Sequence, residues 1–217
     1  MNTFYFIAGP IAAGKTTLMD SKLYNFSDAR INFFDHDKAK LMVQMYADGA
    51  KTNDISLSKA LNNAISDSLA NNKGFMIQSY FTNERLPQIN DFLHKYKNKF
   101  LFEAHFISVD NIETLKERAL KREKLGGHTS GLKSINKTYK QSFANFIKYL
   151  PQFNKTTFWD NSKEFGFNDM QPQFILEETK FSFVNAEITE FAKQLATNII
   201  DKPLEYKTQN ETTNQKR

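Results

Sequence analysis

Residues 6–18 read FIAGPIAAGKTTL, and this stretch decides the fold. Gly9 and Gly14 bracket four residues and are followed by Lys15 and Thr16, which matches the pattern GxxxxGK[ST]. In this pattern the glycines let backbone N–H groups turn inward around a phosphate, and the helix that follows adds its dipole. The lysine reaches the terminal phosphates, and the hydroxyl can ligate magnesium. The stretch therefore predicts a loop that binds the phosphates of ATP with Mg²⁺.

The flanking segments are those that such a loop requires. An apolar run over residues 3–8 predicts a strand, and residues 12–24 are compatible with a helix. The alternative is a chance match in an ordinary strand-to-helix turn, which this strand and helix context disfavours. The candidate nucleotide-binding residues of the loop are Gly9, Pro10, Ala12, Ala13, Gly14, Lys15, Thr16 and Thr17.

Strand and helix patterns alternate along the rest of the chain. Strands are expected at residues 31–34, 75–81, 100–109 and 156–159, with a β-ribbon over 174–184. Helices are expected at residues 38–46, 55–72, 85–96, 111–124, 135–150 and 186–200. This alternation predicts an α/β fold, a P-loop NTPase three-layer sandwich with a parallel central sheet and flanking helices. We expect a single kinase-like domain over residues 1–200 and a polar, disordered tail over 201–217.

Length and composition agree with one domain of this kind. The 217 residues suffice for one well-buried α/β domain and are too few for two comfortable ones. There is no apolar run of membrane-spanning length and no basic segment followed by an apolar run at the N-terminus, so a cytoplasmic location is expected. Cysteine is absent, which excludes disulfides and thiolate metal sites.

The positive charge is concentrated in one segment. The chain carries 29 Lys and Arg against 24 Asp and Glu, a net charge of +5. Residues 116–140 alone hold eight basic residues and two acidic ones, so the rest of the chain is close to neutral. A compact basic patch beside a phosphate-binding loop favours a phosphorylated small molecule over a long polyanion, although the patch leaves RNA open.

Two carboxylates follow the second predicted strand. Asp35 and Asp37 come directly after residues 31–34, at the strand end where ligands of open α/β sheets bind. One of the two carboxylates could hold magnesium through water, while the other could accept the proton of a substrate hydroxyl. The alternative for Asp37 is that it caps the helix that follows.

These features resemble the P-loop small-molecule kinases, and a second block narrows the resemblance. Residues 122–131 read REKLGGHTSG, a Tyr139-containing helix and QSFANF follow, and residues 158–162 read FWDNS. Together with AGPIAAGKTTL and DHD, this combination resembles the zeta toxin family over roughly residues 4–162. The resemblance implies a kinase that uses ATP to phosphorylate the sugar 3-hydroxyl of UDP-N-acetylglucosamine or a related nucleotide sugar, and it makes an antitoxin a possible protein partner.

The resemblance also assigns residues. It implies that Asp37 is the catalytic base, which leaves Asp35 as the magnesium ligand. It also implies that Lys15 acts in the loop and that Arg118 or Arg122 belongs to a basic lid helix. Two positions depart from the family pattern. Gln78 stands where the family usually has a glutamate, with Glu84 the nearest acid, and Lys137 stands in place of an arginine next to the tyrosine. Lysine lacks the planar fork with which arginine grips two phosphate oxygens, so the exchange bears on activity and on the acceptor.

The remaining candidate residues give weaker indications of function. Asn161, in DNS after the last predicted parallel strand, lies where kinases of this class often meet the adenine ring. His128 follows two glycines and is assigned no chemistry. The 21 phenylalanines are spread along the chain at strand and helix spacings, which indicates core packing and not a platform for bases.

The sequence leaves three functions open. The first is a zeta-toxin-type phosphotransferase, favoured by the loop, the aspartate and the basic helix. The second is a nucleotide-binding module or switch with little catalysis, favoured by Gln78 and Lys137. The third is a P-loop kinase acting on RNA ends, supported by the basic patch alone.

Overall fold

The computed structural model describes residues 1–21, 30–34, 39, 54–126, 130–163, 170–177, 180–184 and 189–200. The predicted helix at 38–46 apart from residue 39, the aspartates at 35 and 37, His128 and the tail at 201–217 lie outside these residues. Among the residues described, no helix is both long enough and apolar enough to cross a membrane. The extent of the domain and the nature of its tail stay predictions.

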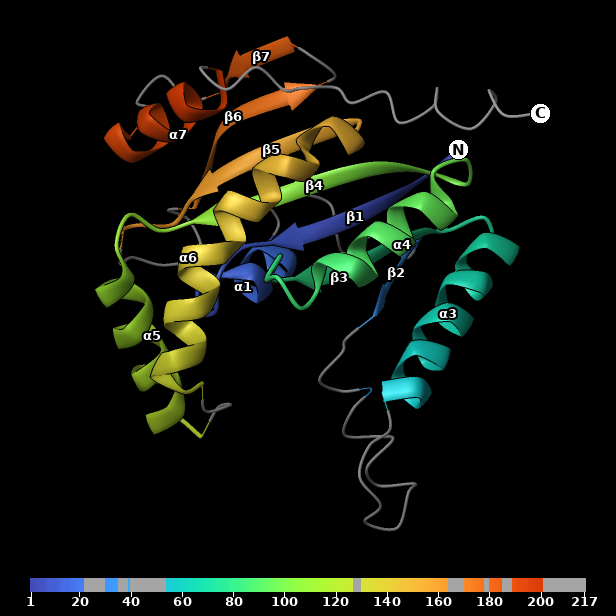
Figure 1. The fold of residues 1–217 in the computed structure, drawn as a ribbon, viewed down its shortest axis with the longest axis horizontal. Coiled ribbons are helices and arrows are strands. Elements are labelled where there is room, and N and C mark those ends of the chain that lie inside the picture. The colour runs from blue at the N-terminus through green and yellow to red at the C-terminus, as the bar shows by residue number, and fades with distance from the viewer. Residues whose placement is uncertain are drawn as a thin grey trace, which may run out of the picture.

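A seven-stranded sheet forms the centre of the molecule (Figure 1). Its strands are β1 (Asn2–Ala8), β2 (Ile31–Phe34), β3 (Gly74–Ser79), β4 (Phe100–Ser108), β5 (Lys155–Asp160), β6 (Gln171–Glu177) and β7 (Lys180–Phe183). They lie in the order β2-β3-β1-β4-β5-β6-β7. The first five are parallel, whereas β6 and β7 add to β5 in antiparallel fashion.

The predicted parallel sheet is thus confirmed for its first five strands. The ribbon predicted at 174–184 is confirmed as β6 and β7, which extend the same sheet and begin earlier, at Gln171. Antiparallel pairing here follows from the short connections between β5, β6 and β7. A short connection can join antiparallel strands, while a parallel pair needs a crossover of a dozen or more residues.

The helices are α1 (Lys15–Asp20), α3 (Asp54–Ala70), α4 (Leu86–Tyr96), α5 (Ile112–Lys124), α6 (Leu132–Tyr149) and α7 (Glu190–Ile200), with a short 3₁₀ helix at Leu150–Gln152. The helix predicted from residue 12 begins at Lys15, because residues 9–14 form the loop before it. The last helix begins at Glu190 and not at residue 186.

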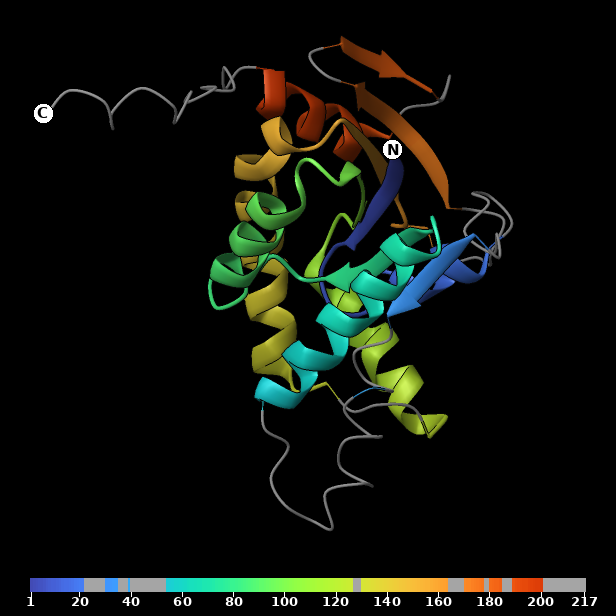
Figure 2. The same cartoon turned by 90° about the vertical axis from the view of Figure 1, so that its right-hand side faces the viewer.

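Two apolar clusters, one on each face, make the fold a three-layer sandwich. The larger cluster joins the sheet to α3, α4, α6 and α7 and contains most of the buried phenylalanines, which confirms their predicted role in the core. The smaller cluster joins the other face to α1 and α5. Figure 2 shows α4, α6 and α7 together on one side of the sheet.

Helix α6 connects the two sides. Ile135 in its first turn packs in the smaller cluster, whereas Phe146 and Tyr149 near its end pack in the larger one. The helix therefore passes the carboxyl ends of the parallel strands, where the loop after β1 lies (Figure 1). Ligands of open α/β sheets bind at this edge.

Candidate active site

At two positions of the loop between β1 and α1, the backbone has a conformation that favours glycine. Gly9 and Gly14 have φ angles of 142° and 104°. A Cβ atom at Gly9 would lie 2.4 Å from the carbonyl oxygen of Ile107, and one at Gly14 would lie 2.4 Å from Nδ2 of Asn161. Both glycines of the sequence motif are therefore required by the conformation and by close packing.

Lys15 is buried under this loop. Its side chain is 5% exposed, and its Nζ donates hydrogen bonds to the carbonyl oxygens of Gly9 at 3.0 Å and Pro10 at 2.7 Å. The same Nζ lies 4.3 Å from the centroid of the Tyr80 ring. Burial, and secondly the nearby charge of Arg122, lower the pKa of Lys15 to about 7. A bound anion would therefore stabilise the charged form of Lys15 and raise its pKa again.

Thr16 begins the exposed side of α1. Its Oγ1 accepts a hydrogen bond from Nε2 of Gln78 at 3.3 Å. A threonine hydroxyl is a hard oxygen ligand of the kind that Mg²⁺ prefers, so Thr16 fits the predicted metal site. Asp35, the other predicted metal ligand, and Asp37, the predicted base, lie outside the described residues, and their roles stay predictions.

The segment after β3 lies beside Lys15 and is fixed by polar side chains of α6. Phe81 has a φ angle of 47°, an uncommon conformation for an aromatic residue. Nδ2 of Asn145 donates to the carbonyl oxygen of Phe81 at 2.9 Å and to Oδ1 of Asn83 at 2.8 Å. The hydroxyl of Ser142 donates to the carbonyl oxygen of Tyr80.

Sequence reasoning missed this polar row on α6. Thr138, Ser142 and Asn145 are spaced four and three residues apart and are all at least 95% buried. Because residues three and four apart share a helix face, their spacing could have marked a polar face among the apolar positions of this helix. Its partners, which lie up to 127 residues away, could not have been found from the spacing.

The two arginines of the basic helix α5 have different surroundings. Arg122 donates from NH2 to Oγ of Ser130 at 3.0 Å, and its charge acts on Lys15. Arg118 donates from NH2 to the carbonyl oxygen of Lys163 at 3.0 Å, beyond the DNS motif. Arg122 thus acts electrostatically on the loop lysine.

Lys137 forms an ion pair with Glu84 on the segment after β3. The hydrogen bond from Lys137, and secondly a backbone hydrogen bond, lower the pKa of the exposed Glu84 carboxyl below its usual value. Both positions at which the sequence differs from the family pattern have a polar partner in the structure. Gln78 contacts Thr16, and Lys137 contacts the acid nearest to Gln78 in the sequence.

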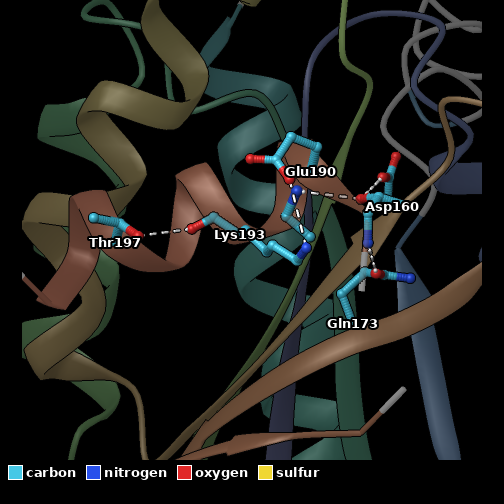
Figure 3. Close-up of polar contacts among 7 residues, drawn as sticks. Asp160, Gln173, Glu190, Lys193 and Thr197 are labelled. Atoms are coloured by element: carbon cyan, nitrogen blue, oxygen red, sulfur yellow. Dashed lines mark hydrogen bonds and ion pairs between the residues drawn. The ribbon is translucent and has the colours of Figure 1, made fainter. Parts of the chain in front are cut away.

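The DNS motif holds several elements together. Asp160 accepts from the backbone N–H of Ser162 at 2.9 Å and from the hydroxyl of Thr189, next to the start of α7. Figure 3 shows Asp160 and Gln173 at this junction, with Lys193 and Thr197 further along α7. Asn161 donates from Nδ2 to the carbonyl oxygen of Ala13 at 2.8 Å. Its predicted contact with adenine stays a prediction, but the side chain contacts the phosphate-binding loop directly.

Among the comparisons with known proteins, the one with solved structures bears on the fold. No protein-family model matches the sequence, and no curated protein matches it. The solved AvrRxo1-ORF1:-ORF2 complex contains a chain with a TM-score of 0.59 and 13% identity, over 90% of this chain and 63% of that one. A structure of the PezAT chromosomal toxin–antitoxin system of Streptococcus pneumoniae has a TM-score of 0.58 and 14% identity, over 93% and 85%.

A chain of the Pnkp1/Rnl/Hen1 RNA repair complex is more distant, with a TM-score of 0.53 and 17% identity over 68% of this chain and 46% of that one. At these identities the similarity shows the fold alone. The chain has the fold of the P-loop kinases, and the resemblance to the zeta toxin family is confirmed at the level of the fold.

Proposed function

We propose that this chain is an ATP-dependent phosphotransferase of the zeta toxin type. The observation that carries the proposal is the loop of residues 9–14, with its two obligatory glycines and the buried Lys15, at the carboxyl end of β1. In a parallel sheet this position presents backbone N–H groups and a lysine to phosphates. The proposed acceptor is a hydroxyl of a nucleotide sugar such as UDP-N-acetylglucosamine or a related metabolite.

The proposed transfer breaks the bond between the γ-phosphorus and its bridging oxygen and forms a bond from phosphorus to the acceptor oxygen. Lys15 contacts the terminal phosphates, and Arg122 stabilises the charge that grows on the moving phosphoryl group. The acceptor hydroxyl gives its proton to Asp37. Thr16 and Asp35 would hold magnesium, which supplies positive charge beside the phosphates when it is bound.

A nucleotide-binding module with little catalysis is the second candidate. The ion pair of Lys137 with Glu84 favours it, because a lysine paired with a carboxylate offers less charge to a phosphate. The basic residues of α5 and α6 also support a kinase that acts on RNA ends. An antitoxin is the proposed protein partner, supported by the fold shared with the PezAT system.

Transfer of label from ATP separates these candidates. Wild type and Lys15→Met are incubated with γ-labelled ATP, magnesium and a panel of UDP-sugars, with a 5′-hydroxyl oligoribonucleotide as a separate arm. We expect a labelled nucleotide sugar from wild type only. Tight ATP binding without any labelled product would favour the module, and a labelled oligonucleotide would favour the RNA kinase. Failure of wild type to bind ATP would refute every version of the proposal.

A further inference from the structure

Two side chains from distant parts of the chain hold the phosphate-binding loop on either side of one residue. Oγ1 of Thr138, on α6, accepts a hydrogen bond from the backbone N–H of Ile11 at 3.2 Å. Nδ2 of Asn161, after β5, donates to the carbonyl oxygen of Ala13 at 2.8 Å. Ala12 lies between the two contacts.

Ala12 has a φ angle of 63°, in the left-handed region. A residue with a Cβ atom adopts this region only at a cost, because the Cβ crowds the backbone, and such conformations persist when the surroundings fix them. Inside the loop, a hydrogen bond from the N–H of Ala13 to the carbonyl oxygen of Pro10 at 3.3 Å supports the turn. The contacts from Thr138 and Asn161 hold it from outside.

Both side chains are themselves fixed. The Thr138 hydroxyl is buried and donates to the carbonyl oxygen of Ile135 at 3.1 Å, so a lone pair stays directed at Ile11. Asn161 is held by its own backbone N–H, which donates to the carbonyl oxygen of Ser108 at 3.0 Å. Because a carbonyl oxygen can only accept, the Ala13 contact also sets which end of the Asn161 amide faces the loop.

Asn161 also fills the space that Gly14 leaves. A Cβ at Gly14 would lie 2.4 Å from Nδ2 and 3.5 Å from Cγ of Asn161. The amide therefore packs directly against the loop backbone at the residue before Lys15. A side chain in this place constrains the loop whether or not a nucleobase lies nearby.

We propose that Thr138 and Asn161 are positioning residues that keep the phosphate-binding loop in its receptive shape. This inference rests on the proposed function, since it assumes that the loop receives a triphosphate. The role proposed for Asn161 can be distinguished from a contact with adenine. A residue that shapes the loop affects every triphosphate ligand equally, whereas a residue that contacts adenine affects only ligands that carry the base.

Ligands with and without a base test the proposal. The full chain is titrated with ATP, GTP and inorganic tripolyphosphate, each with magnesium, in wild type, Asn161→Ala and Thr138→Val. Loss of one hydrogen bond that holds the loop is expected to weaken all three ligands by the same factor, about five- to tenfold. Thr138→Ser keeps the hydroxyl and is expected to restore most of the affinity.

Thr197→Val is the matched control. Thr197 on α7 donates from Oγ1 to the carbonyl oxygen of Lys193 at 3.0 Å, a hydroxyl-to-backbone contact in another element. It should leave the affinity for tripolyphosphate as in wild type. Thermal melting of each variant identifies any that is unfolded, and Asn161→Ser replaces Asn161→Ala in that case.

Three results would overturn the inference. A loss confined to ATP, with tripolyphosphate unaffected, would make Asn161 a base contact. A lower melting temperature with unchanged affinities would make both residues merely structural. An equal loss of affinity in Thr138→Val and Thr138→Ser would show that the Thr138 hydroxyl does not hold the loop. If wild type binds no triphosphate at all, the proposed function fails first, which the titration of wild type shows by itself.

Discussion

The side-chain amide of Gln78 lies 3.3 Å from the hydroxyl oxygen of Thr16, so the end of β3 contacts the first turn of α1. Nε2 of Gln78 also lies 3.2 Å from the sulfur of Met19. The family pattern usually has a glutamate at this position. Thr16 is a proposed magnesium ligand, so a carboxylate at position 78 would lie beside the proposed metal site. We therefore expect the exchange of glutamate for glutamine to change the magnesium concentration that the protein needs.

Gln78→Glu is therefore expected to lower the magnesium concentration needed for half-maximal nucleotide turnover. A carboxylate beside Thr16 attracts a hard divalent cation and accepts hydrogen bonds from its waters more strongly than an amide does. Turnover is measured over a magnesium series at fixed ATP, with Gln78→Met as the uncharged control. An unchanged or higher magnesium requirement in Gln78→Glu would separate this position from the metal site.

Lys15 gives ATP binding a dependence on pH. Its pKa of about 7 in the folded protein lies below the ordinary lysine value of 10.5, so the buried amine becomes increasingly neutral as the pH rises above 7. A phosphate needs the charged form, and binding must then take up a proton. Affinity is expected to fall above pH 7, by up to about tenfold per pH unit. Calorimetry with magnesium-ATP between pH 6.5 and 8.5 measures this fall, and Lys15→Met should abolish it.

The fold was predictable because its signals are local. Three of residues 31–34 are apolar and acidic residues follow them, and β2 occupies these four positions. The loop was predictable for the same reason, since Gly9, Gly14 and Lys15 lie within seven positions. The hydrogen bond of Asn161 with Ala13 joins residues 148 positions apart. Such pairs depend on how α6 and β5 pack against the loop, which no local pattern encodes.

Arg122→Ala is expected to reduce the rate of transfer more than it reduces ATP affinity. Arg122 lies close enough to lower the pKa of Lys15, and a charge there is worth most when negative charge develops on the transferring group. The expected loss in kcat is on the order of 10². Arg118→Ala removes the same charge from the same helix, where the guanidinium contacts Lys163, and should cost less. Equal losses in kcat and affinity would place Arg122 in ground-state binding.

His105 is expected to make stability fall at acidic pH. It is fully buried in β4, where Nδ1 accepts from Nε1 of Trp159 at 3.1 Å and Nε2 lies 3.3 Å from Oε1 of Glu103. Burial lowers the pKa of His105 below 6.5, with Glu103 partly opposing this effect. Below pH 6.5 the unfolded chain therefore binds a proton that the folded chain does not, which costs up to about 1.4 kcal/mol per pH unit.

Chemical denaturation of wild type between pH 7.5 and 5.5 measures this loss. His105→Gln keeps an acceptor for Trp159 and removes the titration, so its stability should be lower at pH 7.5 but depend less on pH. Parallel profiles of the two proteins would assign the acid sensitivity to other groups.

Asp37→Asn tests whether the chain transfers phosphate to a hydroxyl or only holds the nucleotide. Asparagine keeps the size of aspartate and removes the base, so ATP affinity should survive while acceptor phosphorylation falls by about 10² to 10⁴. If Asp37 only capped a helix, asparagine would replace it well, because the two residues cap almost equally. The measurement is transfer from labelled ATP to UDP-sugars, wild type beside the variant, with thermal melting as the control for folding. Full activity in a normally folded Asp37→Asn would leave the proposed mechanism without its base.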